Sequence, residues 1–228
     1  MSLVIAGAAV VVSVSVGPIG VSPIEALRVV VNRLPGVGID HGLDPTQAAI
    51  ISEVRLPRVL LAAVVGSVLA TAGGAYQATF RNPLADPFLL GAAAGAGLGV
   101  TVALTGAGAE LGDSGAGVTA AAFAGAMVAV ALTYGLGASA GERSGASLIL
   151  AGVAVAALLS ALQNLLLQQD DESIRDVYAW LLGRFNVAGW DEVRLVIPSA
   201  FATLTVLVLA GRRLDLLALG DEPLPPVR

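Results

Sequence analysis

The chain has 228 residues, of which 56% are hydrophobic and only 13% are charged, and its formal net charge is −5. Soluble domains carry roughly 25% charged residues. A mean hydropathy of +0.85 implies more apolar surface than a soluble fold of this size could bury. The composition therefore excludes an ordinary soluble domain and predicts an integral membrane protein.

Several kinds of functional site are excluded by the residue types that the sequence lacks. There is no cysteine, so no disulfide framework, iron–sulfur cluster or thiolate zinc site can form. The single histidine, His41, lies in a polar stretch with few potential co-ligands, so we predict no metal site. All twelve basic residues are arginine, which excludes a phosphate-binding loop with its lysine. We predict no catalytic residues, no cofactor and no nucleic-acid binding.

Six apolar segments predict the architecture. In lipid, each must form a helix or a strand of a closed barrel, and these runs lack the alternation of barrel strands. We therefore predict an all-α, polytopic membrane helix bundle with about six transmembrane helices. A short amphipathic helix is expected at residues 24–32, and Trp180 and Trp190 are expected to anchor at the membrane interface. The six segments are residues 2–17, 57–80, 88–105, 117–138, 147–168 and 194–211.

The stretch from Arg55 to Gly99 carries the most specific pattern. It begins with RLPR, and Pro57 is expected to mark the start of a long apolar helix. The polar turn RNPLADP follows, in which Asp86 before Pro87 is typical of an N-cap and the first helical position. A Gly-rich apolar run comes next. The pattern predicts a helix, a hard turn and a second helix inside the membrane.

This stretch resembles the signature of the permease subunits of iron–siderophore, haem and cobalamin ABC importers. The RLPR opening, the small-residue helix, Gln77 and the sequence NPLADP with its Gly-rich continuation carry the similarity. Weaker similarity extends from about Gly17 to Glu222. The resemblance implies a permease domain over residues 1–222 that holds about six of the family's ten helices. Residues 223–228 are expected to be a proline-rich tail outside the family pattern, so that the chain resembles a permease truncated on its C-terminal side.

Orientation in the membrane is expected from the resemblance, which places the N-terminal end inside the cell. The positive-inside rule opposes this choice, because more arginines then fall outside than inside. The inner set is Arg81, Arg143, Arg212, Arg213 and Arg228, and the outer set is Arg28, Arg33, Arg55, Arg58, Arg175, Arg184 and Arg194.

Arg55 and Arg58 have two readings. They are three residues apart at the entrance of the long helix, so they share one face of a helical turn. One reading is snorkelling to lipid headgroups. The resemblance implies the other, in which both arginines lie on the outer surface and dock acidic residues of a substrate-binding protein.

Small and polar residues inside the apolar segments are expected to pack helices together. The candidates are Gly73, Gly74, Gln77, Gly91 and Gly95, because small residues let backbones approach closely in lipid and amides bond between helices. Packing alone is the favoured reading for any single glycine. A role in lining a transport pathway is the minority reading, also for Gln163 and Asn164.

The stretch from Leu214 to Glu222 is similar to the family's cytoplasmic coupling segment. The resemblance implies that Leu219, Gly220, Asp221 and Glu222 fit a groove on an ATP-binding subunit. Gly220 would permit a sharp turn between two short helices, but the prolines after Glu222 prevent the second helix. An amphipathic tail is the alternative. We therefore expect weak binding to an ATPase without stimulation of its turnover.

The resemblance implies an importer permease of the cell membrane for ferric siderophore, haem or cobalamin. Its expected partners are a pair of ATP-binding subunits, which use the ATP, an extracytoplasmic substrate-binding protein, a second permease copy and membrane lipid. The alternative is a truncated, non-transporting membrane scaffold or remnant. Nothing in the sequence separates the three cargoes.

Overall fold

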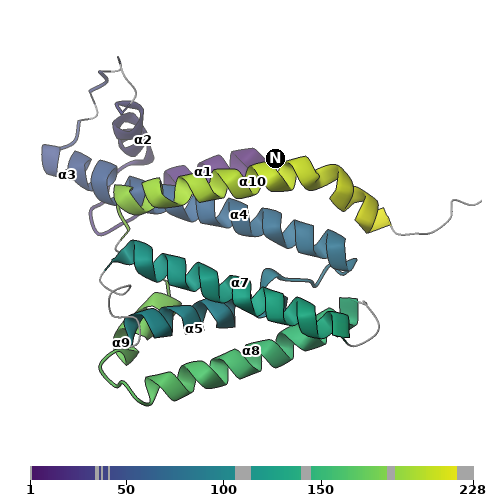
Figure 1. The fold of residues 1–228 in the computed structure, drawn as a ribbon. Coiled ribbons are helices and arrows are strands. Elements are labelled where there is room, and N and C mark those ends of the chain that lie inside the picture. The colour runs from purple at the N-terminus through teal and green to yellow at the C-terminus, as the bar shows by residue number, and fades with distance from the viewer. Residues whose placement is uncertain are drawn as a thin grey trace, which may run out of the picture. The chain divides into compact units, whose positions relative to one another are not determined.

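The computed structural model describes residues 2–33, 36, 38–40, 42–105, 114–139, 145–183 and 188–219. These residues form helices joined by turns and contain no strand, which confirms the all-α prediction. Figure 1 labels the helices along the chain. They are α1 (Ser2–Ser15), α2 (Pro23–Val31), α3 (Pro45–Ala49), the π-helix η1 (Ile50–Arg55), α4 (Leu56–Phe80), the 3-10 helix η2 (Pro87–Leu90), α5 (Ala92–Leu104), α7 (Gly115–Ser139), α8 (Gly145–Leu167), α9 (Ile174–Leu181) and α10 (Trp190–Leu219).

Each of the six predicted apolar segments forms helix. Four helices are long and apolar enough to cross a membrane, namely Pro45–Phe80, Gly115–Ser139, Gly145–Leu167 and Trp190–Ala218. The helices α1 and α5 are apolar but shorter. The short helix predicted at residues 24–32 is α2.

Two predicted helix boundaries differ from the structure. Pro57 does not start a helix, because the helical backbone runs without a break from Pro45 through η1 into α4. Residues 88–105 are not one helix, because Gly91 adopts a left-handed conformation with φ of 75° between η2 and α5.

By their contacts the residues divide into two compact units. Unit 1 comprises residues 1–71 and 184–211, and unit 2 comprises residues 72–183 and 212–228. The helices α4 and α10 therefore each begin in unit 1 and end in unit 2.

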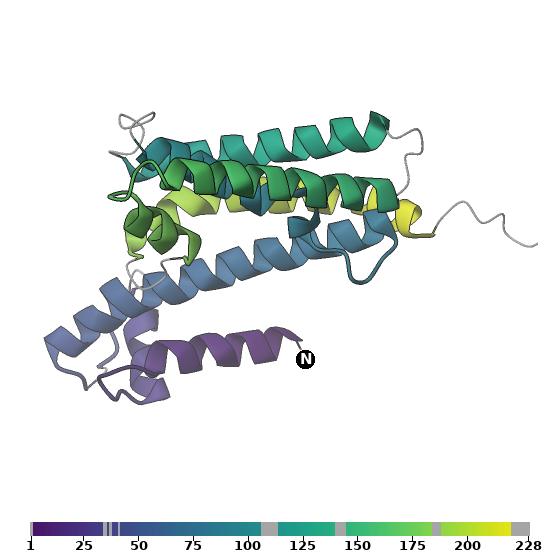
Figure 2. The ribbon, with the colours of Figure 1, turned by 90° about the horizontal axis from the view of Figure 1, so that it is seen from below.

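Unit 1 has a small core where α1, α2 and η1 meet. Val14, Ala26, Val29 and Ile51 are buried together there. Figure 2 shows the short α2 beside α1. A capping box between Ser22 and Glu25 starts α2. The backbone and side-chain hydrogen bonds from Ser22 lower the pKa of the Glu25 carboxyl.

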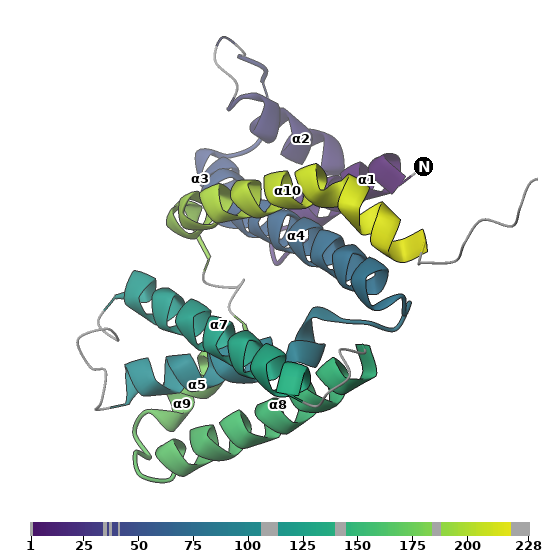
Figure 3. The same ribbon diagram turned by 45° about the vertical axis from the view of Figure 1, so that its right-hand side comes forward.

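Unit 2 is built on three helices, α5, α7 and α8, each of which packs against the other two. Figures 1 and 3 show them side by side. Two buried clusters lie between them, one around Val100, Val118 and Ala122 and another around Ala129, Val155 and Leu159. The helix α9 packs against α5.

Candidate docking and coupling sites

The entrance of α4 is shaped by a π-helical turn that precedes a proline. The Leu56 amide donates to the Ile51 carbonyl, five residues back, instead of to Ser52. The next donor in a π-helical ladder would be the amide of residue 57, but Pro57 has no N–H. The Ser52 carbonyl is therefore left without an intrahelical donor. Such a group needs a partner from elsewhere.

Two side chains from distant parts of unit 1 bond to this carbonyl. The indole Nε1 of Trp190 donates to the Ser52 oxygen at 3.0 Å, and Nη2 of Arg33 donates at 3.3 Å. Arg33 also forms an ion pair with Glu53, and its guanidinium lies 5.4 Å from the centre of the Trp190 ring. These contacts connect the start of α10 and the end of α2 to η1.

Arg55 is buried inside unit 1, with 8% of its surface exposed. Its Nη1 donates to the carbonyls of Val14 at 3.1 Å and Ser15 at 3.0 Å, and its Nη2 donates to Ile19 at 2.8 Å. The last carbonyls of a helix lack intrahelical donors, and a positive charge near them is favourable. Arg55 thus caps the C-terminus of α1. This placement differs from the expectation that Arg55 lies on the outer surface.

Arg58 is placed differently from Arg55. It is half-buried, and its Nε atom is buried without a hydrogen-bond partner among the described residues. Because Arg55 is held by backbone carbonyls, the two arginines do not form a matched pair of free guanidinium groups. Unlike Arg55, Arg58 makes no hydrogen bond to a backbone carbonyl among the described residues, and it is the more exposed of the two.

The polar turn after α4 is fixed by side chains of its own sequence. The Asn82 side-chain oxygen accepts from the Leu84 amide at 2.9 Å, and the Asp86 carboxylate accepts from the Phe88 amide at 2.7 Å. Asp86 therefore N-caps η2, with Pro87 at its first position, as the sequence predicts. Ala85 is buried in the turn.

Glycines make the closest helix crossings in unit 2. A Cβ atom added to Gly95 would clash with the Gly125 backbone, and one added to Gly99 would clash with Ala121. A Cβ added to Gly152 of α8 would clash with the Leu89 carbonyl of η2. At these three glycines, the backbone of a neighbouring helix occupies the space that a side chain would need.

The other predicted packing residues have varied surroundings. A Cβ on Gly91 would touch the α8 backbone at 3.4 Å, whereas a Cβ on Gly73 or Gly74 would meet nothing within 4 Å. Gln77 is exposed, while Gln163 is buried against Gly97.

Thr133 makes a structural contact between α7 and η2 that the sequence pattern did not single out. It is completely buried, and its hydroxyl donates to the Leu90 carbonyl at 3.0 Å. This bond satisfies a carbonyl next to the break at Gly91. A threonine in an apolar helix gives no separate signal, because its hydroxyl usually bonds back to its own helix.

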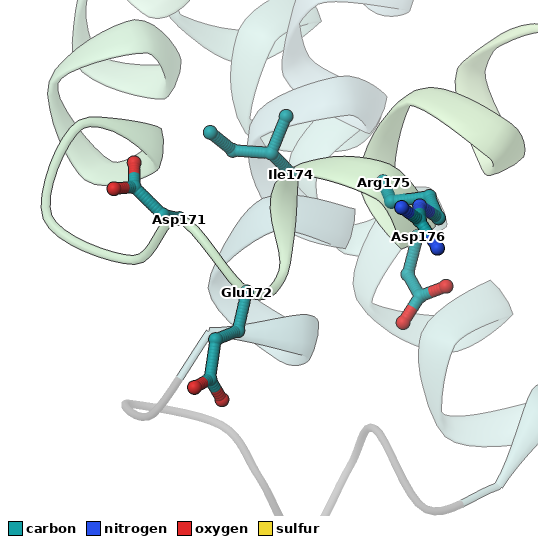
Figure 4. A pocket seen from close by; sticks show the side chains of 5 residues that line it. All are labelled: Asp171, Glu172, Ile174, Arg175 and Asp176. Atoms are coloured by element: carbon teal, nitrogen blue, oxygen red, sulfur yellow. The ribbon is translucent and has the colours of Figure 1, made fainter.

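A pocket of about 590 Å³ lies at the start of α9, lined by Asp171, Glu172, Ile174, Arg175 and Asp176. Figure 4 shows that the three carboxylates point in different directions and do not converge on one point. Among the described residues, no group of three or more His, Cys, Asp or Glu side chains could hold a metal ion.

The predicted coupling segment lies at the end of α10. Leu219 is the last residue of that helix. Gly220, Asp221 and Glu222 lie outside the described residues.

Comparison with known proteins identifies the class of this helical membrane protein. The sequence profile of the FecCD transport family matches residues 4–224. The chain belongs to this family, and it is a multi-pass protein of the cell membrane.

Individual relatives agree with this assignment. The chain is 35% identical to the cobalamin import system permease protein BtuC of Halobacterium salinarum, covering 81% of this chain and 49% of the relative. It is 32% identical to the Fe(3+)-citrate import system permease protein YfmE of Bacillus subtilis, covering 93% of this chain and 60% of the relative. It is 37% identical to the hemin transport system permease protein HmuU of Yersinia pestis, covering 75% of this chain and 51% of the relative. The chain spans about half the length of the curated relatives that it matches.

A solved structure described as an inward-facing conformation of a metal-chelate type ABC transporter has a similar fold. The TM-score is 0.74 at 28% identity, and the match covers 96% of this chain and 63% of that chain.

Proposed function

We propose that this chain forms membrane-spanning helices of an ABC importer permease. In this proposal a substrate-binding protein delivers a ferric siderophore, haem or cobalamin to the outer side. A pair of ATP-binding subunits on the inner side drives translocation, and a second permease copy completes the membrane part. The chain itself has no catalytic role, and ATP is bound and hydrolysed only by the partner subunits.

The family match over residues 4–224 is the observation that carries the proposal. The helical arrangement supports it, since 96% of the chain superposes on a metal-chelate type transporter with a TM-score of 0.74. Relatives of nearly equal identity are named for cobalamin, ferric citrate and hemin, so identity alone favours no single cargo.

Two places in the chain are candidates for partner contacts. Arg58, at the entrance of α4, is half-buried and forms no ion pair among the described residues, so its guanidinium is the candidate contact for a carboxylate of the binding protein. Leu219 to Glu222, at and after the end of α10, would contact an ATP-binding subunit. A change at that contact would then be passed to the membrane helices as a shift between two packed states.

Uptake into proteoliposomes tests this function. The chain would be reconstituted with ATP-binding subunits and a binding protein from the same genome, and cyanocobalamin, ferric citrate and hemin would be offered separately. ATP-dependent accumulation of one cargo, abolished when the phosphate-loop lysine of the ATP-binding subunit is replaced, is the expected result. Stable insertion without binding of ATP-binding subunits and without uptake of any of the three would instead indicate a non-transporting scaffold.

A further inference from the structure

Arg81, the first residue after α4, has an unusual backbone conformation. Its φ is +49°, and among the described residues it is the only one other than glycine with a positive φ. An L-residue with a side chain adopts this left-handed region only at an energetic cost.

The C-terminus of α4 ends in a motif that usually has glycine at the position of Arg81. The Asn82 amide donates to the Gln77 carbonyl at 3.2 Å, and the Arg81 amide donates to Ala78 at 3.4 Å. These two bonds form a Schellman motif, in which the left-handed position is usually glycine. Glycine would serve the backbone better here, so the arginine side chain must be explained by what it contacts.

The side chain reaches the far end of the sequence. Nε of Arg81 donates to the Leu217 carbonyl at 2.7 Å, across 136 positions and within unit 2. Leu217 lies in the last turn of α10, where carbonyls lack intrahelical donors. A guanidinium at this position also complements the negative end of the helix dipole.

We propose that Arg81 is a positioning residue that fixes the last turn of α10 to the end of α4. This inference rests on the proposed function in one respect: the last turn of α10 leads into the segment expected to bind an ATP-binding subunit. Movement of that segment would then be transmitted directly to α4 and to the polar turn that follows it. The strained backbone at Arg81 is retained because the side chain carries this contact.

Three substitutions separate the side chain's role from the strain of its backbone. Arg81→Gly removes the side chain and relieves the strain, Arg81→Met removes the donor and keeps the strain, and Arg81→Lys keeps a cationic donor. The sequence has no cysteine, so Gln77→Cys and Leu216→Cys introduce a single pair of labelling sites. Both positions are exposed, one on each helix end.

Nitroxide labels on this pair would be measured by electron paramagnetic resonance in the full chain in lipid nanodiscs. One narrow distance distribution is expected for the parent and for Arg81→Lys, and a broad one for Arg81→Met and Arg81→Gly. Thermal unfolding of Arg81→Gly should be unchanged or shifted to higher temperature, which would exclude misfolding as the cause. A distribution in Arg81→Gly and Arg81→Met as narrow as in the parent would overturn the proposal.

A second measurement uses the reconstituted transporter. The amount of cargo transported per ATP hydrolysed should fall about fivefold or more in Arg81→Met and Arg81→Gly and recover in Arg81→Lys. Equal ratios in all four proteins would contradict a positioning role in transport. Failure of the proposed function is distinguishable, because then the parent itself binds no ATP-binding subunit while the label distances still report on the Arg81 contact.

Discussion

The Trp190 indole and the Ser52 carbonyl are hydrogen-bonded at 3.0 Å although they lie 138 positions apart. The bond exists because of a third residue. In the π-helical turn of η1, the donor to the Ser52 carbonyl would be the backbone amide of residue 57, but Pro57 has no N–H. A sequence feature that normally breaks helices here creates an acceptor that holds the start of α10.

Pro57→Ala and Trp190→Phe should therefore be energetically coupled. An alanine amide at position 57 can donate to the Ser52 carbonyl within the helix. Because this carbonyl also accepts from Arg33, it would then depend little on the indole bond. The decrease in the free energy of unfolding caused by Trp190→Phe should be smaller in the Pro57→Ala background. The expected difference is about 1 kcal/mol, the usual net value of a hydrogen bond. A double-mutant cycle on thermal unfolding in detergent measures this coupling.

The control pairs Pro57→Ala with Trp180→Phe, since Trp180 packs in unit 2 near Val100. The effects of these two changes on the free energy of unfolding should be additive within roughly 0.5 kcal/mol. Additivity in the Trp190 cycle as well would show that Pro57 does not govern the bond.

Arg55→Met should destabilise unit 1. It would leave three carbonyls near the end of α1 without their donor, in a site where Arg55 is 8% exposed. Removing one partner of a buried, charge-assisted set costs roughly 2–5 kcal/mol. We expect a clear fall in melting temperature by circular dichroism. Arg28→Met, at an exposed position of α2, is the matched control and should melt like the parent; equal melting of both variants would mean that the cap contributes nothing.

Gly125→Leu should disrupt the packing of α5 against α7. The added side chain would meet the Gly95 backbone directly, and overpacking costs about 1–3 kcal/mol or more. Gly135→Leu is the matched control, because it lies on the same helix and a Cβ there meets nothing within 4 Å. Thermal unfolding should separate the two variants, and similar melting temperatures would exclude a tight crossing at Gly125.

The sequence predicts the helices well and the interruptions poorly, for a physical reason. Apolar length is a property of each segment alone, so all six segments form helix and the capped turn from Asn82 to Asp86 follows from local chemistry. The continuity through Pro57 and the break at Gly91 depend on partners elsewhere. At the first, the Trp190 indole donates to the Ser52 carbonyl. At the second, the Thr133 hydroxyl donates to the Leu90 carbonyl, and the Gly152 backbone lies close to Gly91.

The arginines illustrate the same limit at the candidate site. Spacing of three residues correctly places Arg55 and Arg58 in one helical turn, but it cannot show that the end of α1 comes within reach of Arg55. Nor does spacing indicate that Arg81 reaches Leu217. Both long-range contacts end on backbone carbonyls, which carry no sequence signature.

The end of α10 should be needed for contact with an ATP-binding subunit. Leu216 is 69% exposed in the last turns of that helix. Leu216→Asp should weaken co-purification of the subunit about tenfold, since an apolar contact would be replaced by a charge. Leu182→Asp, at an 85% exposed position after α9, is the control and should leave co-purification unchanged. Equal retention by both variants would mean that this part of α10 is not the contact.

Arg58→Glu, with Arg55 left intact, should weaken docking of an acidic binding protein. The original pair cannot be reversed together without removing the α1 cap, so the single change is the informative one. A fall in affinity of about tenfold or more is expected at low salt, and it should shrink as salt screens the charges. Surface plasmon resonance on the chain in nanodiscs at two ionic strengths measures both effects.

Arg28→Glu controls for net charge and should bind like the parent. If Arg58→Glu also binds like the parent at low salt, the guanidinium at the entrance of α4 interacts with lipid headgroups rather than with a binding protein.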